Sequence, residues 1–177
     1  MGRLKARYNF SRKHLIYFWI FAVYLIAGAA FLYFGLQPVS SEEVYARESA
    51  VSDGRLIISG IDLDTPTVAV KLNGNDLEVP DQIAGSYSAH ANKTLLLGHS
   101  STVFKNLKEI DLAQLITYDG KPYIVTAIEE KAKEDISMKK VLQAEDIDTI
   151  VLMTCSGEEI GNTNDYTHRL IITAEAA

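Results

Sequence analysis

The apolar positions of the chain form two patterns, and the first is a continuous run from Leu15 to Leu36 without a charged residue. At a rise of about 1.5 Å per residue, a helix over this run would be about 33 Å long, enough to cross the hydrocarbon core of a bilayer. Aromatic residues lie towards its two ends, as they do at membrane interfaces: Tyr17, Trp19 and Tyr33. The run predicts one N-terminal transmembrane helix over residues 15–36.

The second pattern begins at Arg55, where short apolar or alternating segments are separated by turn residues. These segments predict strands over residues 55–58, 67–72, 77–79, 94–97, 112–118, 121–128, 149–153 and 169–173. Asp119-Gly120 joins two of them, and this dipeptide predicts a two-residue hairpin turn because it accepts positive φ. Roughly eight short strands with few helices indicate an all-β fold, a closed or nearly closed barrel.

The segments between these strands carry weaker signals. Residues 37–53 are polar and predict a stalk or a short helix, and the polar residues 86–93 predict a loop. Between Val103 and Ile110 the apolar residues have a helical spacing, and a second short helix is expected near Ser137.

The charges of the chain predict its orientation. Residues 1–14 carry only basic charges: Arg3, Lys5, Arg7, Arg12 and Lys13. By the positive-inside tendency this tail stays in the cytoplasm, and everything after Pro38 lies outside. A cleavable signal peptide is the alternative, with cleavage near Ala27-Gly28-Ala29, but apolar sequence continues past that site, which favours a retained anchor. In either case the rest of the chain is exported.

These boundaries divide the chain into a cytoplasmic tail (1–14), a signal-anchor helix (15–36), a stalk (37–53) and an extracellular folded domain (54–177). Without the basic tail the chain has 12 Lys and Arg against 23 Asp and Glu, a net charge near −11. A domain with this charge is not expected to bind nucleic acid.

Cys155 is the only cysteine of the chain, and it follows the predicted strand 149–153. A free cysteine is often a small buried apolar residue, and this interpretation remains open from position alone. In an oxidising compartment, however, an unpaired cysteine indicates an intermolecular disulfide or a reactive thiol.

The last two predicted strands are consecutive, so we expect them to pair antiparallel, with residues 156–168 as a 13-residue loop between them. This hairpin places Arg169 beside Cys155 and on the same strand face as Ile171 and Thr173. A guanidinium in that position can favour a thiolate or bind an oxyanion. The alternative is an ordinary surface arginine at a strand end.

A nucleophilic cysteine also needs a proton carrier, and histidine is the usual one. His99 follows an apolar strand and a glycine, so it also emerges at a strand end, and it is the histidine that we favour. The other histidines are less suitable. His14 lies at the membrane edge, His90 in the predicted polar loop, and His168 on the strand face opposite Arg169.

Three segments together resemble the sortases, cysteine transpeptidases on the surface of mainly Gram-positive bacteria. They are Leu95-Leu96-Leu97-Gly98-His99, Val151-Leu152-Met153-Thr154-Cys155 and Arg169-Leu170-Ile171-Ile172, within a likeness that covers about residues 54–174. The family motif is Thr-Leu-x-Thr-Cys, and this chain has Val151 in place of the first threonine.

The resemblance implies an eight-stranded sortase barrel and a catalytic triad of His99, Cys155 and Arg169. Cys155 would cleave an LPXTG-type sorting signal of a surface protein after its threonine and form a thioester. The acyl group would then pass to an amine, from a peptidoglycan precursor or a pilin lysine. Substrate recognition would involve residues 129–148 and 156–168.

No cofactor is required by this chemistry. Some relatives bind calcium with acids in these regions, and four are present here: Glu129, Glu130, Glu134 and Asp135. A zinc site is less favoured, because His90, His99 and Cys155 lack a compact ligand spacing. Three alternatives stay open: a pilin-polymerising sortase, an exported cysteine hydrolase that uses water, and a catalytically silent membrane-anchored binding or assembly protein.

Overall fold

The structure, a computed structural model, describes residues 17, 19–26, 40–50, 52–73, 76–161, 163 and 165–177. The chain divides into two compact units, Met1–Val39 and Ser40–Ala177. In the first unit the described residues, 17 and 19–26, are helical. None of the helices in the described part of the chain has the length and apolar character needed to cross a membrane. The basic tail and most of the predicted helix 15–36 lie outside the described residues.

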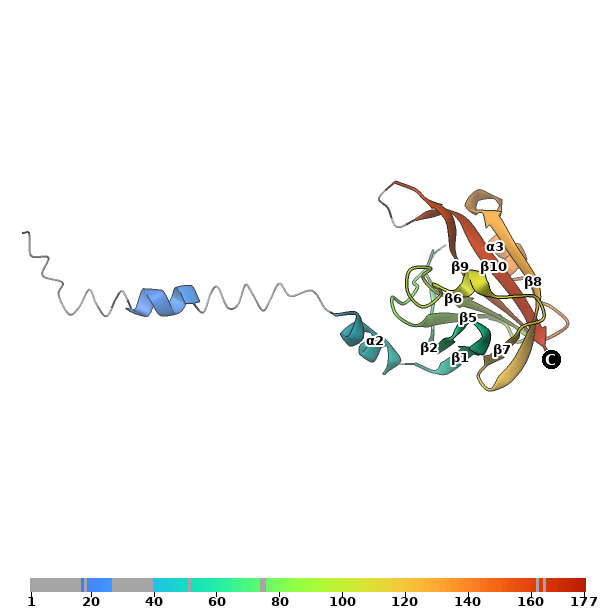
Figure 1. The fold of residues 1–177 in the computed structure, drawn as a ribbon, viewed down its shortest axis with the longest axis horizontal. Coiled ribbons are helices and arrows are strands. Elements are labelled where there is room, and N and C mark those ends of the chain that lie inside the picture. Colours follow the sequence, from blue (N-terminus) through green and yellow to red (C-terminus); the bar gives the residue numbers. More distant parts are fainter. Residues whose placement is uncertain are drawn as a thin grey trace, which may run out of the picture. The chain divides into compact units, whose positions relative to one another are not determined.

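The second unit is built around a closed barrel of eight strands, which confirms the predicted all-β barrel (Figure 1). Around the barrel the strands follow the order β1-β2-β5-β6-β9-β10-β8-β7. Their bounds are β1 Gly54–Ile58, β2 Leu63–Ala69, β5 Ala84–His90, β6 Lys93–Leu97, β7 Leu115–Tyr118, β8 Lys121–Ala132, β9 Thr149–Glu159 and β10 Tyr166–Ala176. Two further strands, β3 (Leu72–Asn73) and β4 (Asp76–Leu77), form a separate small sheet.

The turn between β7 and β8 has the predicted geometry. Asp119 and Gly120 both have positive φ, 49° and 75°, as the mirror-image hairpin turns require. The Asp119 carboxylate also accepts a hydrogen bond of 2.9 Å from the backbone N–H of Arg55, which fixes the turn to the adjacent strand β1.

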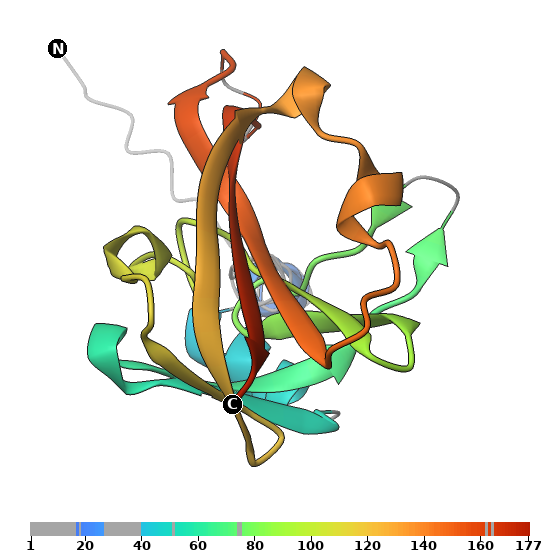
Figure 2. The same ribbon diagram turned by 90° about the vertical axis from the view of Figure 1, so that its right-hand side faces the viewer.

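The three longest strands, β8, β10 and β9, lie side by side on one wall of the barrel (Figure 2). The predicted 13-residue loop 156–168 was wrong, because β9 continues to Glu159 and β10 begins at Tyr166. This end of the hairpin is mostly exposed, so its polar residues can extend the strands without an apolar alternation. Gly157, with φ of 79°, lies where the register between β9 and β10 shifts.

Two other sequence predictions were wrong. The predicted polar loop 86–93 is mainly strand: β5 pairs with β2 on one side and with β6 on the other. The predicted helix between Val103 and Ile110 is a series of turns followed by the 3₁₀ helix η2 (Leu107–Glu109). The helical spacing arose because Phe104, Leu107 and Ile110 all enter the core from this connection.

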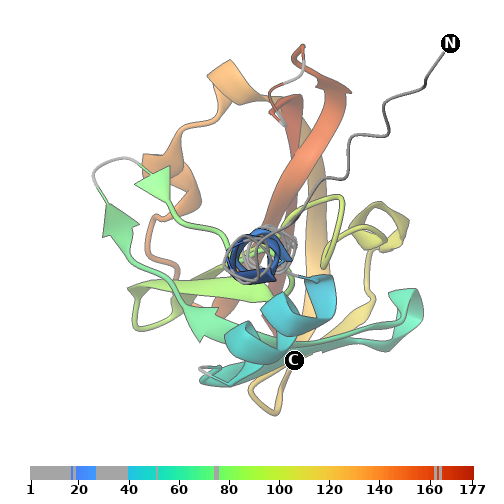
Figure 3. The same ribbon diagram turned by 90° about the vertical axis from the view of Figure 1, so that its left-hand side faces the viewer.

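Two α-helices accompany the barrel. The polar segment before the barrel contains α2 (Ser41–Ser49), which begins with a capping box formed by Ser40 and Glu43. It contacts β2, and Figure 3 shows the cyan helix next to the first strands of the barrel. The connection between β8 and β9 contains the 3₁₀ helix η3 (Lys133–Asp135) and then α3 (Met138–Val141), which confirms the short helix expected near Ser137.

Strand alternation divides the apolar side chains between two clusters. Ile150 and Leu152 of β9 point into the barrel, together with Leu170 and Ile172 of β10. The alternate residues of these strands, Val151, Met153 and Ile171, face outwards. With Leu95 and Leu97 of β6 they form a second cluster. Side chains of the α3 segment and of β4 pack over this outer cluster, among them Ile136, Val141, Leu142 and Leu77. Cys155 and Arg169 continue the outward-facing rows by alternation.

Candidate active site

Cys155 and Arg169 are direct partners across the β9–β10 pair. In an antiparallel pair, opposite residues have Cα atoms about 4.5–5.5 Å apart and side chains on the same face. The hairpin therefore makes Cys155 and Arg169 neighbours on one strand face, at the end of the outer apolar cluster. Cys155 is a free cysteine and is partly exposed.

His99 lies two residues after the end of β6, the strand that neighbours β9. Strands β6 and β9 are parallel neighbours, with Leu97 opposite Met153. One residue further on, the buried hydroxyl of Thr154 donates a hydrogen bond of 2.7 Å to the carbonyl oxygen of Gly98. His99 and Cys155 are the next residues after this bonded pair, so the same register places them opposite each other.

The backbone of His99 is held by the turn that follows it. Its carbonyl oxygen accepts hydrogen bonds from the N–H groups of Thr102, at 3.2 Å, and Phe104, at 3.0 Å. The Phe104 side chain is buried in the barrel core. Gly98 makes this tight return possible, because a Cβ there would lie 2.6 Å from Val103 and 2.7 Å from Phe104.

The imidazole of His99 is 42% exposed, and its Nε2 lies 3.9 Å from the Asp81 carboxylate. Asp81 is in turn fixed through its backbone. Its carbonyl oxygen accepts a hydrogen bond of 2.6 Å from the Thr102 hydroxyl, and its N–H donates to the Glu48 carboxylate of α2 at 2.8 Å.

The Arg169 guanidinium is 17% exposed and is held by three acceptors. Nη1 donates to the carbonyl oxygens of Tyr166 (3.0 Å) and His168 (2.9 Å), and Nη2 donates to Asp165 (2.8 Å). Asp165 also pairs with Lys133 of η3, so it joins the β8–β9 connection to the guanidinium. Hydrogen bonds from Lys133 and then Arg169 hold the pKa of the Asp165 carboxyl well below its usual range.

The other histidines lie differently. His90 is exposed at the end of β5. His168 is in β10 next to Arg169, where its Nδ1 shares a hydrogen bond of 2.8 Å with the Thr167 hydroxyl. Of the three residues that the sequence nominated, Cys155 and Arg169 are therefore register partners, and His99 follows the strand that neighbours β9.

Sequence reasoning missed the residues that support these three. Asp165 lies four residues before Arg169, and nothing in the sequence distinguishes it from the other polar residues of the hairpin end. Asp81 lies near His99, and Glu48 binds Asp81, only because the tertiary fold brings these distant parts of the sequence together.

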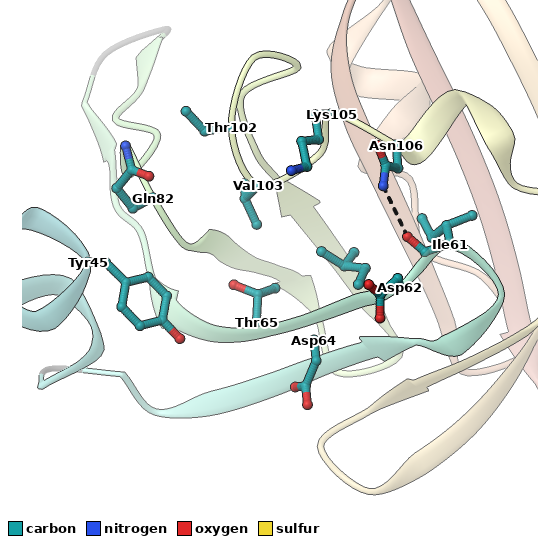
Figure 4. Close-up of a pocket in the computed structure, with 11 residues that line it drawn as sticks. Tyr45, Ile61, Asp62, Asp64, Thr65, Gln82, Thr102, Val103, Lys105 and Asn106 are labelled. Carbon is teal, nitrogen blue, oxygen red and sulfur yellow. Dashed lines mark hydrogen bonds between the residues drawn. The ribbon is translucent and has the colours of Figure 1, made fainter. Parts of the chain in front are cut away.

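Among the cavities lined by described residues, one contains Cys155 and two others lie elsewhere on the domain. A cavity of about 650 Å³, here named the Cys155 cavity, is lined by Cys155, the segment after His99 and the open end of the barrel. A cavity of about 430 Å³, here named the outer cavity, lies between the η3–α3 segment and the outward residues Val151, Ile171 and Thr173. A third, of about 200 Å³, lies between α2, β2 and the segment 102–106, where Asn106 donates to the Ile61 carbonyl oxygen (Figure 4).

Within the described ranges, no three His, Cys, Asp or Glu side chains are grouped to hold a metal ion. Of the acids considered for calcium, Glu129 and Glu130 are in β8 and Glu134 and Asp135 are in η3. Glu129 forms an ion pair of 2.7 Å with Lys131, and Asp135 lines the outer cavity.

Comparison with known proteins gives one family. The model of the sortase domain matches residues 56–177. Among solved structures, a lid mutant of sortase A from Corynebacterium diphtheriae is similar, with 26% sequence identity and a TM-score of 0.53 over 72% of this chain and 70% of that chain.

Two further structures are similar in fold. Sortase A of Listeria monocytogenes is 15% identical, with a TM-score of 0.56 over 72% of this chain and 88% of that one. Sortase C-1 of Actinomyces oris is 18% identical, with a TM-score of 0.53 over 80% of this chain and 82% of that one. Among curated proteins, none matches the chain.

Proposed function

We propose that this chain, which belongs to the sortase family, is a transpeptidase that uses Cys155 to cleave an LPXTG-type sorting signal and transfers the acyl group to an amine. The observation that carries the proposal is the pairing of the strands that bear the three residues. Cys155 and Arg169 are register partners, and the Thr154–Gly98 hydrogen bond joins the positions directly before Cys155 and His99.

In the first half of the reaction, Sγ of Cys155 attacks the carbonyl carbon of the threonine, and the thiol proton is carried by His99. The C–N bond then breaks, the proton passes from His99 to the leaving amine, and a thioester remains on Cys155. The partly exposed positions of both residues are compatible with access by a peptide.

Arg169 would stabilise the oxyanion that forms when the thiolate adds to the carbonyl. A guanidinium has five N–H groups, and three hydrogen bonds to protein acceptors are described here, so donors remain for the oxyanion. Those three bonds also fix the orientation of the guanidinium before substrate arrives. Such preorganisation is what makes an oxyanion site effective.

In the second half, an amine attacks the thioester carbonyl and His99 accepts its proton. The C–S bond breaks, the new amide leaves, and the thiol of Cys155 is restored. The amine would come from a peptidoglycan precursor or from a pilin lysine.

The residues of the sorting signal before the threonine would lie along the outer face of β9 and β10. The outer cavity supports this placement, because it continues the row of Arg169 through Ile171 and Thr173 and is covered by the predicted recognition segment 129–148. Val151 and Ile171 supply apolar contacts there.

We further propose that the chain is held in the cell membrane by residues 15–36, with its N-terminus in the cytoplasm and the domain outside. The test is protease treatment of intact cells that carry the full-length chain with a tag at Ala177. Loss of the tag without lysis supports the orientation, and full protection contradicts it.

The catalytic proposal is tested with a peptide that contains a sorting signal. Cys155→Ala should abolish cleavage and the thioester seen by mass spectrometry. Arg169→Ala should lower the rate about 10²- to 10³-fold, as for loss of an oxyanion donor. His99→Ala should abolish transfer to an amine.

The chain offers matched controls. His90→Ala removes an exposed histidine, and Arg55→Ala breaks an exposed ion pair with Asp64, 2.7 Å long, away from these strand ends. Both should keep the wild-type rate. Full activity of a folded Cys155→Ala or Arg169→Ala variant would disprove the mechanism.

A further inference from the structure

The structure also bears on which amine the enzyme accepts. We propose that the Cys155 cavity is the acceptor site, and that it selects an amine that carries a free carboxylate, bound by Lys105 and Lys108. The proposal rests on the proposed function, since only a thioester on Cys155 needs an acceptor.

The position of the cavity suits the second substrate. It is lined by Thr154 and Leu170, which face the barrel interior, whereas the outer cavity lies on the opposite face of the same strands. It is also lined by Ser100, the residue that follows His99. An amine in this cavity reaches the thioester beside the proton acceptor, from the side that the sorting signal leaves open.

The charges around the cavity differ from those of the rest of the domain. The chain after its basic tail has a net charge near −11, with 12 Lys and Arg against 23 Asp and Glu. Yet Lys105 and Lys108 line the Cys155 cavity against a single carboxylate, Glu130. Both lysines are exposed, and neither forms an ion pair within the described part of the chain.

The outer cavity provides a contrast. Two of the lysines that line it are neutralised within the protein: Lys93 pairs with Glu145 at 3.2 Å, and Lys131 pairs with Glu129 at 2.7 Å. The third, Lys140, forms no ion pair among the described residues, but this cavity also has three carboxylates, Glu129, Asp135 and Glu145. The Cys155 cavity differs in that its two lysines outnumber its single carboxylate.

Two ammonium groups repel an alkylammonium ion and attract a carboxylate, and each carboxylate oxygen can accept a bond from one of them. The charge pattern thus favours an amino acid or peptide with a free carboxylate over an isolated lysine side chain. Ser156 lines the same cavity, and its buried Oγ has no hydrogen-bond partner among the described residues, so a polar group of the acceptor can satisfy it.

The chemical step is balanced without a further reactant. The neutral amine forms a C–N bond to the thioester carbonyl as the C–S bond breaks. The proton that the nitrogen loses passes to His99 and then to the sulfur of Cys155. The lysines bind the carboxylate and take no part in the bond changes.

The test uses the purified full-length chain, a sorting-signal peptide as donor, and two acceptors that differ only in the carboxylate, triglycine and triglycinamide. Ligation is followed by mass spectrometry over a range of acceptor concentrations. For the wild type we expect a KM for triglycine about fivefold lower than for its amide, the size that two exposed ion pairs give. The double variant Lys105→Gln/Lys108→Gln should lose this preference.

Lys121→Gln is the matched control, because Lys121 lies at the Asp119–Gly120 turn and pairs with Asp148 at 3.3 Å. It should keep the preference. Equal KM values for the two acceptors in the wild type overturn the proposal. The proposal is also overturned if the double variant, assayed without acceptor, forms the thioester more slowly by the same factor as it ligates triglycine. In that case the cavity would bind the leaving peptide and not the acceptor. Absence of any thioester in the wild type would overturn the proposed function itself.

Discussion

The hydroxyl of Thr154 donates a buried hydrogen bond of 2.7 Å to the carbonyl oxygen of Gly98. These two residues directly precede Cys155 and His99, so one bond fixes the register between the end of β6 and the middle of β9, where the reacting groups lie. Gly98 is also tightly packed, because a Cβ at this position would meet Val103 and Phe104 at less than 3 Å. The relative position of thiol and imidazole thus depends on the bond between the two residues that precede them.

Thr154→Val should separate this effect from loss of packing. Valine keeps the shape of the side chain but leaves the Gly98 carbonyl oxygen without its partner, which costs about 1–3 kcal/mol. We expect a lower free energy of unfolding in urea and a fall in kcat of about tenfold, because the two strand ends lose their fixed register.

Thr149→Val is the control for that experiment. Thr149 is also buried, lies at the other end of β9 and donates 2.8 Å to the carbonyl oxygen of Ile147. Its replacement should cost similar stability without a change in kcat at temperatures where the protein is folded. An equal loss of kcat in both variants would show that Thr154 acts only through stability.

Asp165→Asn should impair catalysis through Arg169. The substitution removes the negative charge between Arg169 and Lys133 and leaves the two cations facing each other. The Asn oxygen can still accept a neutral hydrogen bond from the guanidinium, but the ion pair that holds Arg169 is lost, so we expect kcat to fall about tenfold with a small change in KM. Steady-state kinetics with the sorting-signal peptide measure both.

Asp64→Asn is the corresponding control, since it breaks the exposed pair between Asp64 and Arg55. That pair contributes little, as exposed ion pairs generally do, and activity should not change. A wild-type kcat for Asp165→Asn would mean that the orientation of Arg169 does not depend on the charge of Asp165.

The same carboxylate predicts a pH dependence of stability. Hydrogen bonds from Lys133 and Arg169 lower the pKa of Asp165 in the folded state. A carboxylate with a lowered pKa contributes stability above its unfolded pKa of about 3.9 and loses it as pH falls through the folded value. The stability difference between the wild type and Asp165→Asn should therefore be constant from about pH 7 to pH 5 and shrink in stronger acid. Urea unfolding at several pH values measures it, and a difference that grows in acid would contradict this assignment.

The sequence predicted the parts of the site that follow from strand geometry. Asp119-Gly120 identified a hairpin, and alternation with consecutive pairing placed Arg169 opposite Cys155. His99 followed from the end of an apolar strand. These features are local or involve neighbouring strands, so the two-residue alternation of strands and the residue preferences of turns were sufficient to predict them.

The sequence did not predict features that tertiary contacts create. The polar residues of β5 form a strand because β2 and β6 pair with it on both sides, not because they alternate. The ends of β9 and β10 project beyond the core, so apolar alternation stops at Met153 although pairing continues. Asp165 is significant only because the fold brings Lys133 to it.

The Glu48 side chain connects helix α2 to the segment beside His99. Both oxygens of the Glu48 carboxylate accept backbone N–H groups, from Asp81 and Gln82, each at 2.8 Å. Asp81 is the residue whose carboxylate lies 3.9 Å from His99 Nε2. No residue of α2 is buried, so this carboxylate is a main connection between the helix and the barrel.

Glu48→Ala should therefore release the turn at Asp81 and lower the rate of acyl transfer several-fold, because the carboxylate beside His99 loses its fixed position. The matched control is Glu43→Ala, which removes the capping box of the same helix, a change of about 1 kcal/mol, but leaves the Glu48 contacts in place. We expect Glu43→Ala to reduce helix content, measured by circular dichroism, with little effect on transfer. Equal effects of the two variants on transfer would assign the role to the helix as a whole and not to the Glu48 contact.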